Sequence, residues 1–291
     1  MVAVPPTIAT LRAGQEVTGV FACTRKDRLT ARTGTPYLAV ELRDRTGSVP
    51  ARAFRDADVL AGRFDRGDVV RVRGRVERFR DELQVELAEI ARAAPGEADP
   101  ATFLPVAYRD MEELDGFLEH LSREVHDPGY ATLLEALVGD AALRADWRQA
   151  PCTRDGHHAY LGGLIEHTVA VAQLAVETCQ LHPRLNSDLL ITAAIVHDLG
   201  KTREFTYGAD IALTDAGRLL GHVELGLALL RERAAGILDA ERLLALSHCV
   251  LTHHGPDRAP GRRFGSPEAV ALYRVNALDA SVKGVLEHGL G

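Results

Sequence analysis

The chain has 291 residues, which exceeds one typical domain, so two domains are expected, each large enough to bury its own core. With 46% hydrophobic and 26% charged residues the composition is that of an ordinary globular protein. No secretory signal is apparent, and no apolar run approaches the roughly 18 residues that a membrane span needs. The cysteines are scattered without a CxxC pair, which argues against a disulfide framework and a thiolate zinc site. We therefore expect a cytoplasmic enzyme or binding protein.

The net charge of −7 conceals an asymmetry along the chain. Residues 1–94 hold 17 Lys+Arg against 13 Asp+Glu, a balance of +4, whereas residues 95–291 hold 17 against 28, a balance of −11. Such a division is typical of a basic module that meets a polyanion, followed by an acidic module whose charge bound cations partly match. Plain scatter of charge between two domains is an equally good interpretation at this point.

From about residue 15 to residue 92 the pattern is that of strands. The segments VTGVFACTRK, YLAVELRD, VPARAF, DVVRVRGRVERF and LQVELAEIARA alternate apolar with polar residues and are separated by Gly, Pro and Asp turns. Five short strands predict a small all-β barrel over residues 1–94. It resembles the OB-fold of the nucleic-acid-binding type, which takes single strands across one face.

The fourth of these segments alternates valine with arginine, which places the valines on one face and the arginines on the other. Gly74 stands where such a strand can bend around a barrel corner. The arginines expected to face outwards and to follow phosphates are Arg71, Arg73 and Arg75. The aromatic candidates for base stacking, each with a core role as the alternative, are Phe21, Tyr37, Phe54, Phe64 and Phe79.

The texture of the sequence changes after the strands. The stretch APGEADPATFLP is rich in Pro, Gly and acidic residues and has no period, so residues 95–108 are predicted to be a linker. Beyond it, MEELDGFLEHLSREV and the segments that follow carry apolar residues at spacings of 3 and 4, typical of helices. The second domain, residues 109–291, is therefore predicted to be an all-α helical bundle.

Histidines are absent from the barrel region and are concentrated on the predicted helices. His167 shares an apolar stripe with Val171, and the pair His197 and Asp198 ends the apolar segment LLITAAIV. The residues on helices that we expect to face inwards are His167, His197, Asp198, His222, His253, His254 and Asp279.

A single inward histidine is more often a hydrogen-bonded core residue than a ligand. Here each buried polar group would need its own partner, because an unpaired one costs about 1–3 kcal/mol. One shared cation, or a pair, satisfies them together. Imidazole and carboxylate without thiolate suit Mn²⁺ first, with Co²⁺, Fe²⁺, Mg²⁺ or Zn²⁺ open, and Asp198 can bridge two ions.

The order His167, then His197 and Asp198, then Asp279 resembles the H…HD…D signature of HD-domain metal-dependent phosphohydrolases. The segments HHAYLGGLIEHT, HDLGKTREF, GRLLGHVELG and LTHHG, preceded by a basic OB-like module, resemble the YhaM-type 3′-5′ exoribonucleases over residues 15 to 285. The resemblance implies one metal on those four residues. It implies a second metal, with Asp198 between the two, on His222, His253 and His254.

The same resemblance implies a mechanism in which metal-bound water yields a hydroxide that attacks phosphorus. It also implies that Lys201 contacts a phosphate oxygen. His253 and His254 can both reach one cluster only at a helix end, which Gly255 and Pro256 would supply. For His157, His158 and His248 a substrate contact and a structural role are both open.

The expected function is a metal-dependent 3′-5′ exonuclease that degrades single-stranded RNA, or also DNA, to nucleoside 5′-monophosphates. One alternative is hydrolysis of small nucleotides or cyclic dinucleotides, with the barrel as an oligomer contact. Another is a non-enzymatic nucleic-acid-binding module with a structural metal. The sequence leaves open the metal, the preference for RNA or DNA, and whether the chain forms a homo-oligomer.

Overall fold

The computed structural model describes residues 6–31, 33–94 and 96–290. The chain divides into two compact units: one runs to residue 105 and includes residues 207–211, and the other contains residues 106–206 and 212–291. Among the described residues, none of the helices combines the length and apolar character that crossing a membrane requires. The expected domain limits at residues 1, 95 and 291 lie outside the described residues.

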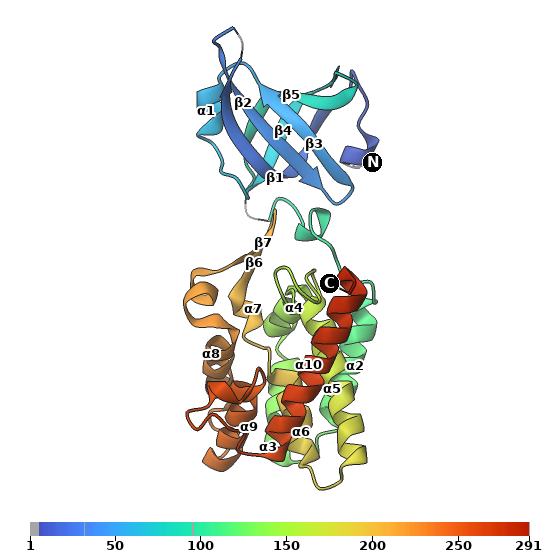
Figure 1. Ribbon diagram of the computed structural model, residues 1–291, viewed down its shortest axis with the longest axis vertical. Coiled ribbons are helices and arrows are strands. Elements are labelled where there is room, and N and C mark those ends of the chain that lie inside the picture. Colours follow the sequence, from blue (N-terminus) through green and yellow to red (C-terminus); the bar gives the residue numbers. More distant parts are fainter. Residues whose placement is uncertain (1–5, 32, 95, 291) are drawn as a thin grey trace. The chain divides into compact units, whose positions relative to one another are not determined.

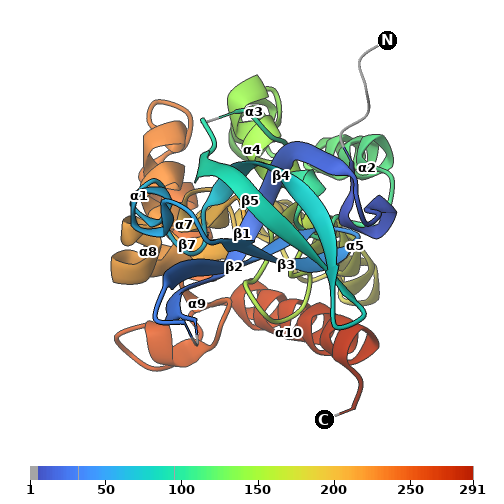
Figure 2. The ribbon, with the colours of Figure 1, turned by 90° about the horizontal axis from the view of Figure 1, so that it is seen from above.

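The first unit is a closed five-stranded barrel (Figures 1 and 2) with the strand order β1-β2-β3-β5-β4. The strands are β1 (Glu16–Thr30), β2 (Pro36–Asp44), β3 (Gly47–Ala53), β4 (Val69–Phe79) and β5 (Glu82–Arg92). A short helix, α1 (Ala57–Ala61), connects β3 to β4. Closure leaves no free sheet edge, and the predicted all-β barrel is confirmed.

The alternation predicted for β4 is present: Val70, Val72 and Val76 are buried in the barrel core, and the arginines between and after them are exposed. Packing separates the five aromatic candidates. Phe21 and Phe64 are buried in the barrel core, with 2% and 3% of their surface exposed. Tyr37, Phe54 and Phe79 lie at the surface instead. Only the latter three can meet a ligand.

Gly74 allows β4 and β5 to approach closely. The register of this strand pair shifts between Arg73 and Gly74, and a Cβ atom at Gly74 would clash with the backbone oxygen of Glu86. A side chain at this position would force the two strands apart. The glycine that the sequence placed at a barrel corner is therefore required by backbone proximity.

The second unit is a helical bundle (Figure 1). Its helices are α2 (Met111–Arg123), α3 (Pro128–Val138), α4 (Ala141–Gln149), α5 (Gly163–Leu181), α6 (Ser187–Val196), α7 (Lys201–Glu204), α8 (Asp215–Ala234), α9 (Ala240–Thr252) and α10 (Pro267–His288). Helix α6 is apolar on all sides and packs against α5, α9 and α10. Such a helix must be surrounded by others, and its end therefore lies inside the bundle.

Two local features differ from the sequence expectations. A small antiparallel pair, β6 (Phe205–Tyr207) and β7 (Ile211–Leu213), follows α7 in a region predicted to be wholly helical. The predicted linker contains a 3₁₀ helix, Pro100–Thr102, followed by the buried Phe103, which packs with Ala22 and Ala209. The predicted linker is therefore partly ordered, with a short helix and a buried phenylalanine. The predicted order, a five-stranded barrel followed by a helical domain, is confirmed.

We predict that Gly74→Ala lowers the free energy of unfolding by about 1–3 kcal/mol, because the added Cβ meets backbone that cannot move away. Calorimetric melting of the full chain measures the loss. Gly116→Ala is the control: it lies in α2 with no atom near its Cβ position, and should raise stability by about 0.5–1 kcal/mol. An unchanged melting curve for Gly74→Ala would contradict the close-approach argument.

Candidate metal centre

The polar centre of the bundle begins where α6 ends. His197 follows the last residue of the helix, and Asp198 comes next; both are buried, with 0% and 1% exposure. His167 is carried to the same place by the buried face of α5 and is likewise fully buried. Because the apolar helix α6 is buried in the bundle, the two residues that follow it, His197 and Asp198, also lie in the interior.

Both oxygens of Asp198 face positively polarised or metal-ligating groups. Oδ2 lies 2.7 Å from Lys201 Nζ, 3.3 Å from His197 Nε2 and 3.5 Å from His167 Nε2. Oδ1 lies 3.4 Å from the Nε2 atoms of both His222 and His253. One carboxylate thus stands between two sets of imidazoles, as a bridging ligand would.

The second imidazole set depends on two interruptions of helices. A break at Gly221, with φ of 72°, precedes His222 in α8, and α9 ends at Thr252, just before His253. The expected helix end at this point is thus observed, and it lets His253 and His254 turn to the same cluster. His222 Nε2 and His254 Nε2 are 2.9 Å apart, and candidate ligand atoms of Asp198, His222, His253 and His254 lie within 4.8 Å of one another.

The hydrogen bonds of the Nδ1 atoms show that the Nε2 atoms, which face the centre, are unprotonated and carry lone pairs. His197 Nδ1 donates to the Ala194 oxygen at 2.8 Å, and His253 Nδ1 donates to the Val250 oxygen at 2.6 Å. His167 Nδ1 donates to Asp279 Oδ2 at 2.6 Å. A neutral imidazole has one N–H, so all three Nε2 atoms are acceptors that point inwards.

Several of these acceptors face one another without a proton between them. His167 Nε2 and His197 Nε2 are 3.2 Å apart. Among the residues described, Asp198 Oδ1 and His253 Nε2 are buried and without a hydrogen-bond partner. Leaving such atoms unpaired costs about 1–3 kcal/mol each. Divalent cations between the acceptors would remove this cost, so the residues present fit a metal centre.

The pKa values agree with a ligand role. Burial lowers the pKa of His167 and of His253 to about 4, so both rings are neutral near pH 7. Burial alone would raise the pKa of Asp198, but Lys201 and His197 outweigh it and hold that pKa well below its usual range. The centre therefore offers neutral imidazoles and an ionised carboxylate, the forms that bind metals.

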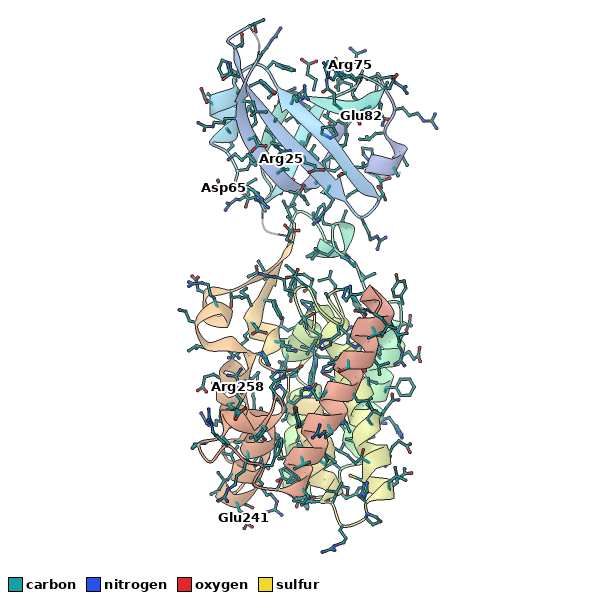
Figure 3. The ribbon with its side chains drawn as sticks, in the orientation of Figure 1. Arg25, Asp65, Arg75, Glu82, Glu241 and Arg258 are labelled. Atoms are coloured by element: carbon teal, nitrogen blue, oxygen red, sulfur yellow. The ribbon has the colours of Figure 1, made fainter. Side chains whose placement is uncertain are left out.

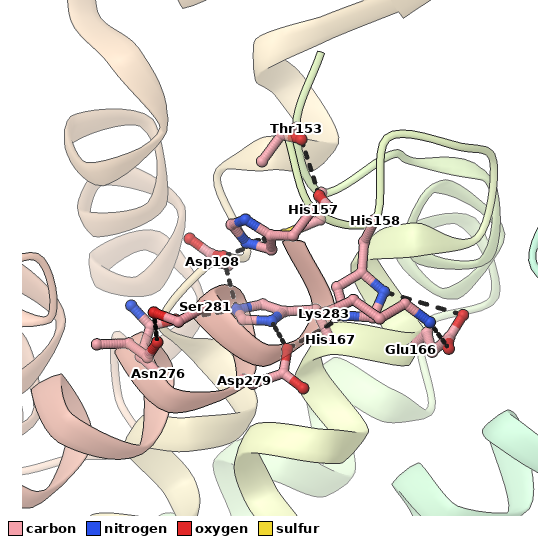
Figure 4. A network of polar contacts seen from close by, with 12 residues as sticks. Thr153, His157, His158, Glu166, His167, Asp198, Asn276, Asp279, Ser281 and Lys283 are labelled. Carbon is pink, nitrogen blue, oxygen red and sulfur yellow. Dashed lines mark hydrogen bonds and ion pairs between the residues drawn. The ribbon is translucent and has the colours of Figure 1, made fainter. Parts of the chain in front are cut away.

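Two polar residues of α10, Asp279 and Asn276, lie next to different nitrogen atoms of the His167 ring. Figure 4 shows the His167 ring between the carboxylates of Asp198 and Asp279. Asp279 Oδ2 accepts from His167 Nδ1 and lies 3.1 Å from His158 Nε2. Asn276 Oδ1 instead lies 3.0 Å from His167 Nε2, on the side of the lone-pair cluster.

The structure buries Lys201, which the sequence placed on a substrate phosphate. Its ammonium contacts Asp198 Oδ2 and donates to Cys152 Sγ at 3.3 Å. Burial alone would lower the pKa of Lys201, but Asp198 and Cys152 outweigh it and raise that pKa above its usual value. Both of these partners are buried side chains, so the ammonium holds the carboxylate in place.

The three further candidate histidines have different surroundings. His157 is half-buried beside the centre, with Nε2 3.6 Å from Cys152 Sγ. His158 is buried behind the centre, and its Nδ1 lies 2.9 Å from the Tyr160 hydroxyl. His248 Nε2 accepts from the Gly265 backbone at 2.7 Å and belongs to none of the clusters of potential ligands found in the described chain.

Sequence reasoning missed three residues at this centre. Glu204 lies 3.2 Å from His222 Nδ1 and orients that ring. Cys152 lies beside Lys201, and burial raises the pKa of its thiol to about 12, so it stays protonated. No spacing pattern indicates either residue. Asn276 had a detectable signal, because it precedes Asp279 by three residues on the same helix.

The barrel carries the other candidate residues. Arg71 Nε lies 2.9 Å from Glu97 Oε1, and Arg73 forms an ion pair with Glu89. Arg75 is exposed and projects from the barrel (Figure 3). The expected row of arginines is therefore present, with two of its members paired to carboxylates.

A cluster of aromatic and basic residues forms a separate surface, which we call the aromatic platform and define as Tyr37, Arg52, Phe54, Phe79 and Arg80. The rings of Tyr37 and Phe54 are stacked with centroids 5.4 Å apart. The guanidinium of Arg52 lies 5.8 Å from the Tyr37 ring and 5.4 Å from the Phe79 ring. Phe54 and Phe79 are 44% and 45% exposed, so together with Tyr37 they form a group of accessible aromatic rings.

Comparison with known families agrees with both units. The family model for the HD domain matches residues 164–281, and that for an OB-fold nucleic acid binding domain matches residues 20–91. The two units therefore match, in chain order, an OB-fold nucleic acid binding domain and an HD domain.

The chain is also similar along most of its length to curated relatives. It is 29% identical to "3'-5' exoribonuclease YhaM" of Bacillus velezensis over 92% of this chain and 86% of that protein. For the Shouchella clausii protein of the same name the identity is 28%, over 93% and 85%. The resemblance to YhaM-type exoribonucleases is thereby confirmed. A solved single-stranded DNA binding protein from Thermus aquaticus is 24% identical over 29% of this chain and 42% of that chain, with a TM-score of 0.26.

We predict that the metal-free protein loses stability as the pH falls from about 6.5 towards 4. His167 and His253 stay neutral in the fold down to a pKa of about 4, whereas in the unfolded chain they take up protons near the ordinary value of about 6.5. The unfolded state therefore binds more protons in this window, and stability decreases. Thermal melting in chelator across this pH range measures the slope.

The matched variants are His253→Asn, which should flatten the slope, and His248→Asn, which should keep it because His248 lies outside the cluster. Equal slopes for the wild type and His253→Asn would show that His253 is not held neutral by the fold.

Proposed function

We propose that this chain is a metal-dependent 3′-5′ exonuclease that hydrolyses single-stranded RNA to nucleoside 5′-monophosphates, with the barrel binding the strand. The observation that carries the proposal is the convergence of unprotonated imidazole nitrogens on the shared carboxylate of Asp198. The similarity to curated exoribonucleases over about nine tenths of the chain supports the choice of substrate.

In this proposal the ligands form two sets that share Asp198. One contains His167 and His197, and the other contains His222, His253 and His254. Divalent ions held there, Mn²⁺ first among the candidates, supply an activated water and stabilise the charge that develops on a phosphodiester. Nitrogen and carboxylate donors suit such ions.

The surrounding side chains of the protein hold this arrangement. Lys201 keeps Asp198 ionised and turned so that Oδ1 points to the second imidazole set, and it is a positioning residue in place of the expected phosphate contact. Glu204 holds His222 through its Nδ1. His157 is half-buried beside Asp198, and burial lowers its pKa to about 4, so its neutral ring can donate one hydrogen bond to a substrate oxygen.

The aromatic platform is the part of the barrel best suited to hold bases. Exposed rings stack on nucleobases of any sequence, and arginine adds a contact to the phosphates. The proposed phosphate contacts are still Arg71, Arg73 and Arg75. Arg71 and Arg73 must release their carboxylate partners before they can bind a phosphate. A tethered barrel raises the effective concentration of the 3′ end at the metal centre.

We predict that purified protein shortens 5′-labelled single-stranded RNA stepwise with Mn²⁺ and not in chelator. Asp198→Asn removes the shared ionised ligand and should lower the rate by about 100-fold or more. His248→Ala is the matched control and should retain the rate, since His248 lies outside the ligand clusters of the described chain. Unimpaired cleavage by Asp198→Asn would overturn the metal mechanism. A parallel DNA strand measures the preference between the two polymers.

We further predict that Phe54→Ala and Phe79→Ala each raise KM for RNA by about tenfold, because one base loses a stacking partner. Hydrolysis of the small diester bis(p-nitrophenyl) phosphate should be unchanged. Val59→Ala is the control, since Val59 is a 58% exposed apolar residue of α1 outside the platform. An unchanged KM for RNA in both platform variants would favour the alternative of small nucleotide substrates.

A further inference from the structure

Asn276 is a buried amide at the metal centre. Its side chain lies on α10, with 6% of the residue exposed. Nδ2 donates to the backbone oxygen of His253 at 3.3 Å, which fixes the orientation of the amide. Oδ1 is therefore turned to the centre, 3.0 Å from His167 Nε2. Because His167 Nδ1 carries the proton, Oδ1 and Nε2 are two acceptors in contact, an arrangement that a cation stabilises.

Asp279 has hydrogen-bond partners for its Oδ2 atom on the side of the His167 ring that faces away from Asp198. Its Oδ2 accepts from His167 Nδ1 and lies within hydrogen-bonding distance of His158 Nε2. His158 in turn contacts the Tyr160 hydroxyl, which donates to Glu166. The Nδ1–H bond and the Nε2 lone pair point in different directions from an imidazole ring, so an ion bound to His167 Nε2 lies away from the carboxylate that holds Nδ1.

We propose that the Asn276 amide oxygen, and not the Asp279 carboxylate, completes the ion site of His167, His197 and Asp198. Asp279 is then a positioning residue that fixes the tautomer of His167. This inference deepens the proposed function, since it rests on the metal centre described there.

The assignment makes the two ion sites unequal in charge. With a neutral amide in the first site, Asp198 is the single ionised ligand for both ions, and its Oδ2 is already paired with Lys201 at 2.7 Å. The second site has Asp198 Oδ1 and the unpartnered His253 Nε2. Ligand charge sets affinity for divalent cations. The site with His253 therefore binds its ion more tightly and is occupied first. The site with Asn276 binds its ion more tightly when a negatively charged phosphate is also present.

The test is a titration of the chelator-treated full chain with Mn²⁺, without RNA, followed by calorimetry and by metal analysis after gel filtration. We expect the wild type to bind one ion tightly and a second weakly. Asn276→Asp should tighten the weak ion by about tenfold or more, because a carboxylate replaces the amide. At two equivalents this variant should give the electron paramagnetic resonance signal of a coupled manganese pair.

Two further variants make the result independent of folding losses. Asn276→Gln retains an amide but displaces its oxygen, so it should lower the affinity for the weak ion. The melting temperature of the metal-free variant reports whether it folds. Asp279→Asn should lower affinity for the weak ion by about 10–100-fold while retaining two binding events. Adding adenosine 5′-monophosphate should tighten the weak ion in the wild type more than in Asn276→Asp.

The inference is overturned if Asn276→Asp leaves Mn²⁺ binding unchanged, or if Asp279→Asn abolishes one of two equally tight ions. Failure of the proposed function looks different. A protein that binds Mn²⁺ in the predicted manner and leaves every RNA strand intact contradicts the exonuclease and supports the assignment of Asn276.

Discussion

The buried carboxylate of Asp198 is the constraint on which the helical unit depends. With 1% of its surface exposed, it cannot be solvated, and one ammonium from Lys201 satisfies only one of its oxygens. The other oxygen faces His222 and His253 without a proton donor among the described residues. A buried carboxylate oxygen without a partner is costly, and the nitrogen atoms that surround it come from several different helices.

Helix ends and breaks place all the proposed imidazole ligands except His167, which lies within α5. His197 and His253 each follow the last turn of a helix and donate Nδ1–H to a backbone oxygen three residues earlier, Ala194 in one case and Val250 in the other. The last carbonyls of a helix lack partners within the helix, so one bond satisfies the carbonyl and orients the ring. His222 follows the break at Gly221. The ligands thus come from positions where the backbone can redirect a side chain without loss of helical hydrogen bonds.

The barrel shows why a count of charges does not identify a binding surface. Its positive balance lies partly in arginines that already hold carboxylates, such as Arg71 with Glu97 and Arg73 with Glu89. The aromatic platform brings Tyr37 and Phe79 against Arg52, and its Phe54 and Phe79 rings are exposed. Stacking surfaces combined with guanidinium groups suit a flexible single strand better than a duplex.

The sequence by itself determined the two-unit architecture, the strand alternation around Gly74, and the histidines that turn inwards, because periodicity and helix-end signals act over a few residues. Tertiary structure alone decided that Phe54 is exposed while Phe64 is buried, and that Lys201 turns to Asp198. It also decided which residue of α10 meets His167 Nε2: Asn276 and Asp279 share a helical face, and only the packing of α10 against α5 places each at a different ring nitrogen. Such choices depend on contacts between segments more than a hundred residues apart, which no local pattern encodes.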